Sequence, residues 1–144
     1  MIKNPNLYHA FIGYLTKKGN KLQAKKIVDD TFFELSRKFN LPLNSIVRNI
    51  LRKMGSNIEL KTVKKKKNTH VVPFAINQTR KNSLLVRKIM SSVHEDSTKR
   101  STTIKLTEEL TGVLLSSKSN KSLLKNKLAL KQAIQNKSNI HFRW

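Results

Sequence analysis

The spacing of apolar side chains constrains the fold of this chain more than any other feature of its sequence, because it is that of a helix everywhere except in one stretch. Apolar residues recur every three or four positions along most of the chain, which is the spacing of one face of an α-helix. From Ile58 to Val63, and again in part of Thr69 to Ile76, apolar and polar side chains alternate as they do in a β-strand. The pattern therefore predicts a mainly α fold with one β-hairpin inserted between helices.

Six helical segments flank the alternating stretch, three before it and three after it. They begin, in chain order, near Tyr8, Asn20, Pro42, Asn82, residues 101–103 and Ser122. The first is expected to end near Lys18-Gly19, because glycine after a lysine in the last turn is typical of a helix stop. Serine or threonine at residues 101–103 is expected to cap the fifth.

Three of these helices carry apolar stripes from which burial can be predicted. The second has Phe32 and Phe33 beside its regular stripe, so it is expected to be well buried. The stripe of the fifth includes Ile104 and Leu110. The sixth carries Leu123, Leu124, Leu128, Leu130, Ala133 and Ile134, and then thins into a polar tail that ends in His141-Phe142-Arg143-Trp144.

The expected hairpin has an unusual tip, Lys64 to Asn68, which contains four consecutive lysines. This tip has no apolar side chain with which to fold onto the core, so it should project into solvent or onto a partner. Pro73 is expected at a sheet edge or a bulge, because proline cannot donate a ladder hydrogen bond. We expect a single domain over residues 1–144, with the hairpin arm at about 58–76 and the C-terminal helix and tail at about 122–144.

The charge of the chain indicates its partner. It has 30 Lys and Arg residues against 8 Asp and Glu residues, for a formal net charge of +22. Such an excess repels itself in a compact fold, and a polyanion neutralises it with release of counterions. Nucleic acid is therefore the leading partner, and an anionic membrane surface is the second.

The motifs of catalysis and cofactor binding are missing from the sequence. Without cysteine there is neither a disulfide framework nor a thiolate zinc site. The four histidines lack ligand spacing, and the 4 glycines form no phosphate-binding loop. Glu108 and Glu109 are adjacent on a helix, point about 100° apart and are interpreted as surface charge. The chain is expected to be no enzyme, with no metal, no cofactor and no small-molecule substrate.

Several basic residues are better explained by RNA than by solvent. Lys64 to Lys67 repel one another unless phosphate lies between them, and Arg80 and Arg87 have the guanidinium geometry that suits phosphate. The basic run Lys118 to Lys131 is as readily a solvated face as a contact surface. Phe142 and Trp144 could stack on a base or dock back onto the core.

The order of several short motifs resembles a known family. From Glu59 onward the chain reads E-L-K, a basic loop, V-P at Val72-Pro73 and R-K-N at Arg80 to Asn82, and it closes with N-K and H-F-R-W. Phe11 to Val28, with its K-K-G-N-K turn, is similar to the first two helices of the same family. These features resemble small-subunit ribosomal protein seven of the bacterial S-seven type, over nearly the whole chain.

This resemblance implies six helices with a β-hairpin arm, and a role in nucleating assembly of the 3′ major (head) domain of small-subunit rRNA. It also implies that the hairpin reaches toward the tRNA exit site and the mRNA exit channel, beside the eleventh small-subunit protein. The predicted RNA-binding residues are Lys17, Lys18, Lys21, Lys61, Lys64, Lys65, Lys66, Lys67, Arg80, Lys81, Asn82, Arg87, Lys137 and Arg143.

The chain also departs from the family pattern. Lys66-Lys67 stands where the family usually has Gly-Gly, and Lys88 stands where an aromatic residue is common. Only a few residues precede the first helix, where bacterial members have a basic arm. Together with the Lys- and Asn-rich composition, these departures suggest a version encoded in the mitochondrion and working in the matrix. A plastid or a reduced bacterial origin stays open.

Three alternatives to a structural rRNA-binding protein were considered. A basic helical DNA-binding regulator is compatible with lysine-rich helices but leaves the hairpin tip unexplained. A peripheral membrane protein would need exposed apolar faces that the core is expected to use. A small RNA-modifying enzyme is the weakest, because no catalytic site can be assembled from the sequence.

Overall fold

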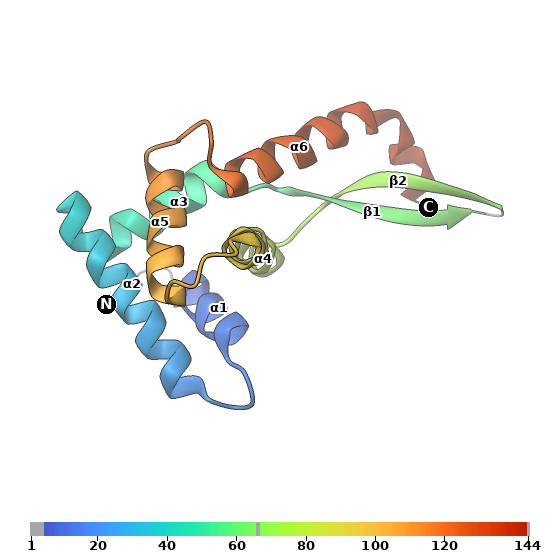
Figure 1. The fold of residues 1–144 in the computed structure, drawn as a ribbon. Helices are drawn as coiled ribbons and strands as arrows, with labels where there is room; N and C mark the ends of the chain where they lie inside the picture. The colour runs from blue at the N-terminus through green and yellow to red at the C-terminus, as the bar shows by residue number, and fades with distance from the viewer. Residues whose placement is uncertain (1–4, 66, 144) are drawn as a thin grey trace.

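The computed structural model describes residues 5–65 and 67–143, and it confirms a mainly α fold with one hairpin between the third and fourth helices (Figure 1). The elements are α1 (Pro5–Leu15), α2 (Lys21–Phe39), α3 (Leu43–Met54), β1 (Ile58–Lys65), β2 (Asn68–Ala75), α4 (Gln78–Glu95), α5 (Thr102–Leu114), α6 (Lys121–Gln135) and a 3₁₀ segment η1 (Lys137–Arg143).

Local sequence signals account for several helix boundaries. Asn20 caps α2 by accepting a hydrogen bond from the backbone N–H of Gln23, and Ser101 caps α5 in the same way, as predicted. The predicted stop of α1 is wrong in place: the helix ends at Leu15, and no basic residue lies in its last turn. Lys18 and Gly19 both adopt positive φ, at 50° and 78°, and turn the chain into α2.

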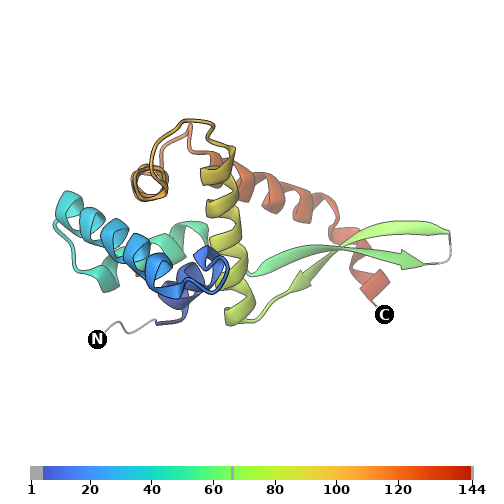
Figure 2. The ribbon, with the colours of Figure 1, turned by 60° about the horizontal axis from the view of Figure 1, so that its bottom comes forward.

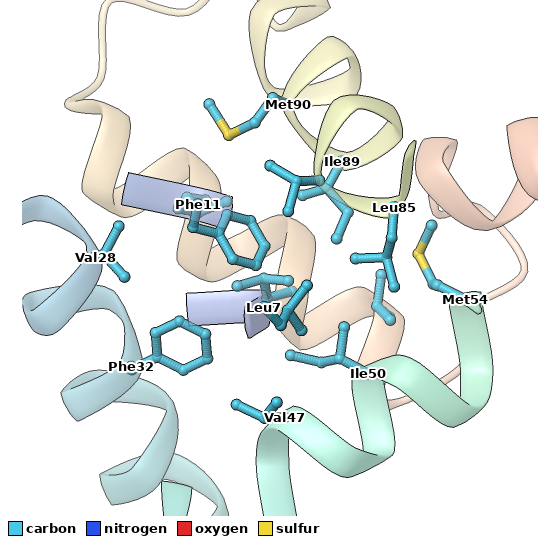
Figure 3. Close-up of a cluster of buried hydrophobic side chains, with 14 of the residues drawn as sticks. Leu7, Phe11, Val28, Phe32, Val47, Ile50, Met54, Leu85, Ile89 and Met90 are labelled. Carbon is cyan, nitrogen blue, oxygen red and sulfur yellow. The ribbon is translucent and has the colours of Figure 1, made fainter. Parts of the chain in front are cut away.

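The core lies among α1 to α5, and α1 lies at its centre (Figure 3). Leu7 and Phe11 of α1 are fully buried, and the ring of Phe11 meets Phe32 of α2 edge-on, with centroids 6.0 Å apart. Ile50 of α3 and Ile89 of α4 close the cluster from the other side. From α6 only Leu123 joins this cluster, so the apolar attachment of the sixth helix to the helical body is limited to its first turn.

The expected burial of two side chains was wrong. Phe32 is 4% exposed, but its neighbour Phe33 is 71% exposed, because adjacent side chains on a helix point about 100° apart. One broad face of α2 is therefore buried, and the rest of the helix is not. Ile104 was also expected in the stripe of α5, yet it is 43% exposed in the first turn of that helix.

Helix α6 leaves the helical body and runs beside the hairpin (Figures 1 and 2). Of its expected stripe, Leu123 and Ala133 are buried, whereas Leu124, Leu128, Leu130 and Ile134 are exposed. The prediction of one buried stripe was wrong, because a helix that extends from the body has only a narrow strand pair against which to pack.

The hairpin is antiparallel, with Ile58 opposite Ala75 and Lys65 opposite Asn68. Its turn is shorter than expected, since Lys64, Lys65 and Asn68, which the sequence placed in the tip, belong to the strands. Pro73 pairs with Leu60 in a sheet of two strands, both of which are edge strands, so its predicted placement is confirmed.

Candidate nucleic-acid interface

The predicted RNA-binding residues fall in four places: the loop between α1 and α2, the hairpin, the start of α4 and the C-terminal segment. These four places belong to separate elements along an elongated molecule (Figure 2). Lys66 lies outside the described residues. The geometry around each of the others separates the side chains that are free to contact a phosphate from those that hold the fold.

The loop before α2 presents free cations. Lys17, Lys18 and Lys21 are exposed, and Lys21 occupies the first turn of α2. A lysine there opposes the helix dipole, which favours negative charge at this end. None of the six α-helices has an acidic residue in its first turn. The start of α6 is already bound by the carboxylate of Glu109 from α5, and the starts of the other helices have no acidic side chain of their own and would favour an anionic partner.

On the hairpin, the register divides the lysines into two groups. Residues at alternate positions share a face of the strand pair, so Lys61 and Lys65 share one face and Lys64 lies on the other. The Nζ atoms of Lys61 and Lys65 lie 5.5 and 5.7 Å from the ring centroids of Phe74 and Phe142. Lys64 and Lys67 are exposed and have no partner among the described residues.

Arg80 is partly engaged within the chain. Its guanidinium donates to both carboxylate oxygens of Glu59, with Nε–Oε2 at 3.1 Å and Nη2–Oε1 at 2.6 Å. This hydrogen-bonded pair holds the pKa of the Glu59 carboxyl below its usual value, with smaller contributions from Lys61 and Arg87. Arg80 therefore fixes the start of α4 to β1 and keeps only part of its donor set for a phosphate. Arg87 is exposed on the same helix.

Lys81 and Asn82 are more structural than their predicted role suggests. The Nζ of Lys81 donates to Oδ1 of Asn57 at 2.8 Å and covers the turn between α3 and β1. Asn82 is 4% exposed, and its Oδ1 accepts from Nε2 of Gln78 at 3.4 Å. RNA contact by these two residues stays a prediction.

The C-terminal segment packs against the hairpin. Its Asn139 donates from Nδ2 to the carbonyl oxygen of Val71 at 3.1 Å. The ring of Phe142 stacks on the imidazole of His70, with centroids 3.9 Å apart and an interplanar angle of 11°. Phe142 was expected either to stack on a base or to dock back onto the core. In this structure its ring docks back onto the chain, but onto the hairpin and not onto the core. Trp144 lies outside the described residues.

Arg143 also turns toward the hairpin, where its guanidinium lies 5.2 Å from the ring centroid of Phe74. Its Nε is buried without an acceptor among the described residues. Lys137, in contrast, is exposed beside a hollow of about 300 Å³ between α6 and the strands.

Polar contacts that sequence reasoning missed attach α6 to α4. Lys88 donates from Nζ to Oδ1 of Asn126 at 2.8 Å, and burial lowers the pKa of this ammonium. Lys125 donates to Glu95 at 2.6 Å and to Ser91 at 2.9 Å. Lys125 is thus engaged within the chain, unlike the exposed lysines elsewhere in the basic run. No local pattern distinguishes such a lysine from one that faces solvent.

Glu109 likewise has a structural role. Its carboxylate accepts from the backbone N–H of Ser122 at 3.0 Å and from the hydroxyl of the same residue, at the start of α6. The interpretation as surface charge is therefore wrong for Glu109. It fits Glu108, whose exposed side chain pairs with Arg100.

Within residues 5–65 and 67–143, no three His, Asp or Glu side chains cluster as metal ligands would. In that part of the chain, no helix combines the length and apolar character needed to cross a bilayer.

Comparison with known proteins covers almost the whole chain. The family model described as Ribosomal protein S7p/S5e matches residues 2–137. Small ribosomal subunit protein uS7 of Wigglesworthia glossinidia brevipalpis is 26% identical over 141 residues, which are 98% of this chain and 88% of that protein. The similarity therefore includes the helical body, the hairpin and α6.

Proposed function

The chain belongs to the ribosomal protein S7p/S5e family, and from this premise we propose that it binds the head domain of small-subunit rRNA and nucleates its assembly. Proteins of this family are structural components of the small ribosomal subunit and serve translation, and they are not an enzyme family. The finer proposal concerns which nucleic acid this chain contacts and which of its basic residues make the contact.

The end of the hairpin supports this proposal best. The strands extend away from the helical body (Figure 1), and Lys64 and Lys67 lie near their end, exposed and without partners among the described residues. An arm of this kind has no apolar surface at its tip to bury. Phosphate groups between the lysines would remove their mutual repulsion, and contacts of this type position a protein on RNA without reading its sequence.

A second group of contacts is proposed at the loop before α2, through Lys17, Lys18 and Lys21. A phosphate there would meet exposed ammonium groups and the N-terminal N–H groups of α2 together. Arg87 and Lys137 extend the interface along α4 and beyond α6. Because Arg143, Lys81 and Asn82 are engaged within the chain, we assign them a smaller share of the binding free energy.

We also propose that the hairpin lies near the tRNA exit site and the mRNA exit channel, beside the eleventh small-subunit protein. The support for this position is the family resemblance of the hairpin and of the helix that follows it. Proximity labelling from the tip in assembled subunits tests it, since labelled exit-site tRNA and the eleventh protein are expected together.

For location, we propose the mitochondrial matrix, within the small subunit of the organelle ribosome. The support is compositional, because Lys outnumbers Arg 23 to 7 and Asn is common. The similar uS7 protein is bacterial, so the test is direct. When purified mitochondria are lysed and sedimented, the chain should be recovered with the small ribosomal subunit. Recovery only outside mitochondria would refute the location.

The deciding experiment measures binding of the purified chain to a transcript of the rRNA head domain and to duplex DNA of equal length, at two salt concentrations. RNA-selective binding that survives moderate salt is expected. Equal binding to both polymers, lost steeply with salt, would refute specific rRNA recognition and favour a general attraction to phosphate. Such a result would also revive the basic DNA-binding alternative.

A charge-matched pair of variants assigns the contact to the hairpin. Lys64→Ala with Lys67→Ala should weaken RNA binding and reduce the salt slope by about 1 for each lysine removed. Lys38→Ala with Lys99→Ala removes the same charge from exposed positions outside the proposed interface and should have a smaller effect. Equal losses from the two pairs would show that only net charge matters.

A further inference from the structure

A hollow beside α2 differs in character from the basic surfaces described above. It has a volume of about 480 Å³, and its walls come from three helices that meet beside the core. The lining includes Asp29, Asp30, Phe32 and Phe33 of α2, with Tyr8 of α1 and Leu43 of α3. We name it the acidic groove. Its volume lies within the range of about 300–1,000 Å³ that is usual for binding pockets.

The apolar part of this groove is open to solvent. Phe33 is 71% exposed, which is more than any other Phe or Tyr side chain in the described part of the chain, and Leu43 at the opposite wall is also exposed. An exposed aromatic ring beside a hollow is typical of an anchor point at protein interfaces, where burial of the ring contributes most of the affinity.

Two acids, one in the groove and one beside it, have no partner within the described part of the chain. Of the 8 Asp and Glu residues, most have partners: Asp29, Glu59, Glu95, Asp96, Glu108 and Glu109 each accept at least one hydrogen bond. Asp30, in the lining of the groove, and Glu34, one turn further along α2 and outside the lining, have no ion pair or hydrogen bond among the described residues. In a chain of charge +22, the unpaired acids thus gather at one place.

Asp29 is engaged in shaping the groove. The hydroxyl of Tyr8 donates to its Oδ1 at 2.5 Å, and burial of the ring, with help from this bond, raises the pKa of Tyr8 to about 12. The hydroxyl therefore stays a donor at neutral pH. The bond joins α1 to α2 across the groove and holds its wall in place in the absence of a partner.

The charges along α2 argue against RNA as the occupant. The first two turns carry Lys21, Lys25 and Lys26, the last turn carries Arg37 and Lys38, and Asp29, Asp30 and Glu34 lie between them. An approaching phosphate would be attracted to both ends of the helix and repelled from the acids in its middle, which include those of the groove. A cationic partner would be attracted to these acids, and it could bury an apolar side chain against the exposed ring of Phe33.

We propose that the acidic groove docks a Lys- and Arg-rich segment of a neighbouring small-subunit protein, with an apolar side chain of that segment seated against Phe33. This inference rests on membership of the ribosomal family and is independent of which rRNA residues the chain contacts. The segment's cations pair with Asp30 and Glu34, and its apolar side chain fills the space between Phe33 and Leu43.

Site-specific photo-crosslinking in assembled small subunits tests this proposal. Phe33 is replaced by photoreactive p-benzoylphenylalanine, and the crosslinked partner is identified by mass spectrometry. The matched control carries the same group in place of Leu22, an exposed residue on the basic half of the same helix. We expect position 33 to crosslink to a basic protein segment with an apolar residue, and position 22 to crosslink to rRNA.

The two positions separate failure of this proposal from failure of the rRNA proposal. Crosslinks from position 33 to rRNA, to a second copy of this chain, or to nothing while position 22 reacts would overturn the docking proposal. A basic protein segment at position 33 with no rRNA at position 22 would support docking and count against RNA contact at the start of α2.

A charge variant then tests why the partner binds. Asp30→Asn with Glu34→Gln keeps the shape of both side chains and removes their charge, and the circular dichroism should be unchanged. Crosslinking from position 33 is expected to fall about fivefold, because complementary charge determines much of the encounter rate. An unchanged yield would refute charge complementarity as the basis of docking.

Discussion

Arg143 donates from Nη2 to the carbonyl oxygen of Pro73, a residue 70 positions earlier in the chain. This bond joins the last described residue of the C-terminal segment to the second strand of the hairpin. With the Phe142–His70 stack it makes the hairpin and η1 a single packed unit, in which each supports the other. A hairpin of two strands alone is marginally stable in water, so this unit is what allows an arm to keep its shape.

Removing this support should loosen the hairpin. Arg143→Ala deletes a hydrogen bond from a charged donor, a loss of about 1.5 kcal/mol, so amides of Asn68–Ala75 should exchange with solvent roughly tenfold faster. Hydrogen exchange measured by mass spectrometry checks this. Lys137→Ala removes the same charge from an exposed residue of η1 and is the control. Equal exchange in both variants would mean that Arg143 does not stabilise the arm.

The Arg80–Glu59 pair should make stability depend on pH. Because the pKa of Glu59 is lowered in the folded chain from its ordinary value of 4.5, the pair stabilises the fold above that value. This stabilisation is lost as the pH falls through the lower, folded-state pKa. Glu59→Gln should therefore be less stable than the parent chain at pH 7, and the difference should shrink below pH 4.5. Urea unfolding at a series of pH values measures it; a constant difference would contradict the assignment.

The fold class could be predicted because each helix carries its own signals. Spacing located α1 to α5, Lys18-Gly19 turns the chain toward α2, and Ser101 starts α5 through a contact three residues away. The hairpin was predictable for the same reason, since alternation is also local. The length of its turn was not, because Lys65 and Asn68 pair across the strands although they interrupt the local alternation of apolar and polar side chains.

The errors concern contacts between distant parts of the chain. The leucines of α6 show an apolar face, but the spacing does not tell whether that face meets this chain or another molecule. The candidate interface has the same limit. Charge indicated which loops are basic, yet a lysine that bonds to Asn57 or Asn126 has the same local sequence character as one that faces solvent. Which of the predicted residues contact RNA stays a prediction.

Gly55 should not tolerate a larger side chain without a loss of stability, because Leu51 and Lys81 lie against it. A Cβ at this position would press on the carbonyl oxygen of Leu51 and lie 2.5 Å from Cε of Lys81. Gly55→Ala must shift the backbone between α3 and β1, and should destabilise the fold by about 1–3 kcal/mol. At Gly13 in α1 an added Cβ meets nothing within 4 Å, so Gly13→Ala should stabilise by about 0.5–1 kcal/mol. Thermal unfolding of both variants checks the contrast, and equal shifts of the unfolding midpoint would contradict it.

Two positions on α5 test how the core is built. Leu110 is fully buried and Ile104 is 43% exposed, although both belong to the stripe expected from the sequence. Leu110→Asp places an uncompensated carboxylate in the core, and should cost about 4 kcal/mol or more. Ile104→Asp places the same group in the first turn of the helix, where the dipole favours negative charge, and should change stability by less than about 1 kcal/mol.

Circular dichroism during urea unfolding distinguishes the two aspartates. The Leu110 variant should lose helical signal at much lower urea than the parent chain, whereas the Ile104 variant should unfold near the parent midpoint. If the Leu110 variant kept the parent midpoint, α5 would not pack as described. If the Ile104 variant unfolded at as low a urea concentration as the Leu110 variant, the first turn of α5 would be buried in solution. The comparison holds the substituted group constant, so burial is what separates the two results.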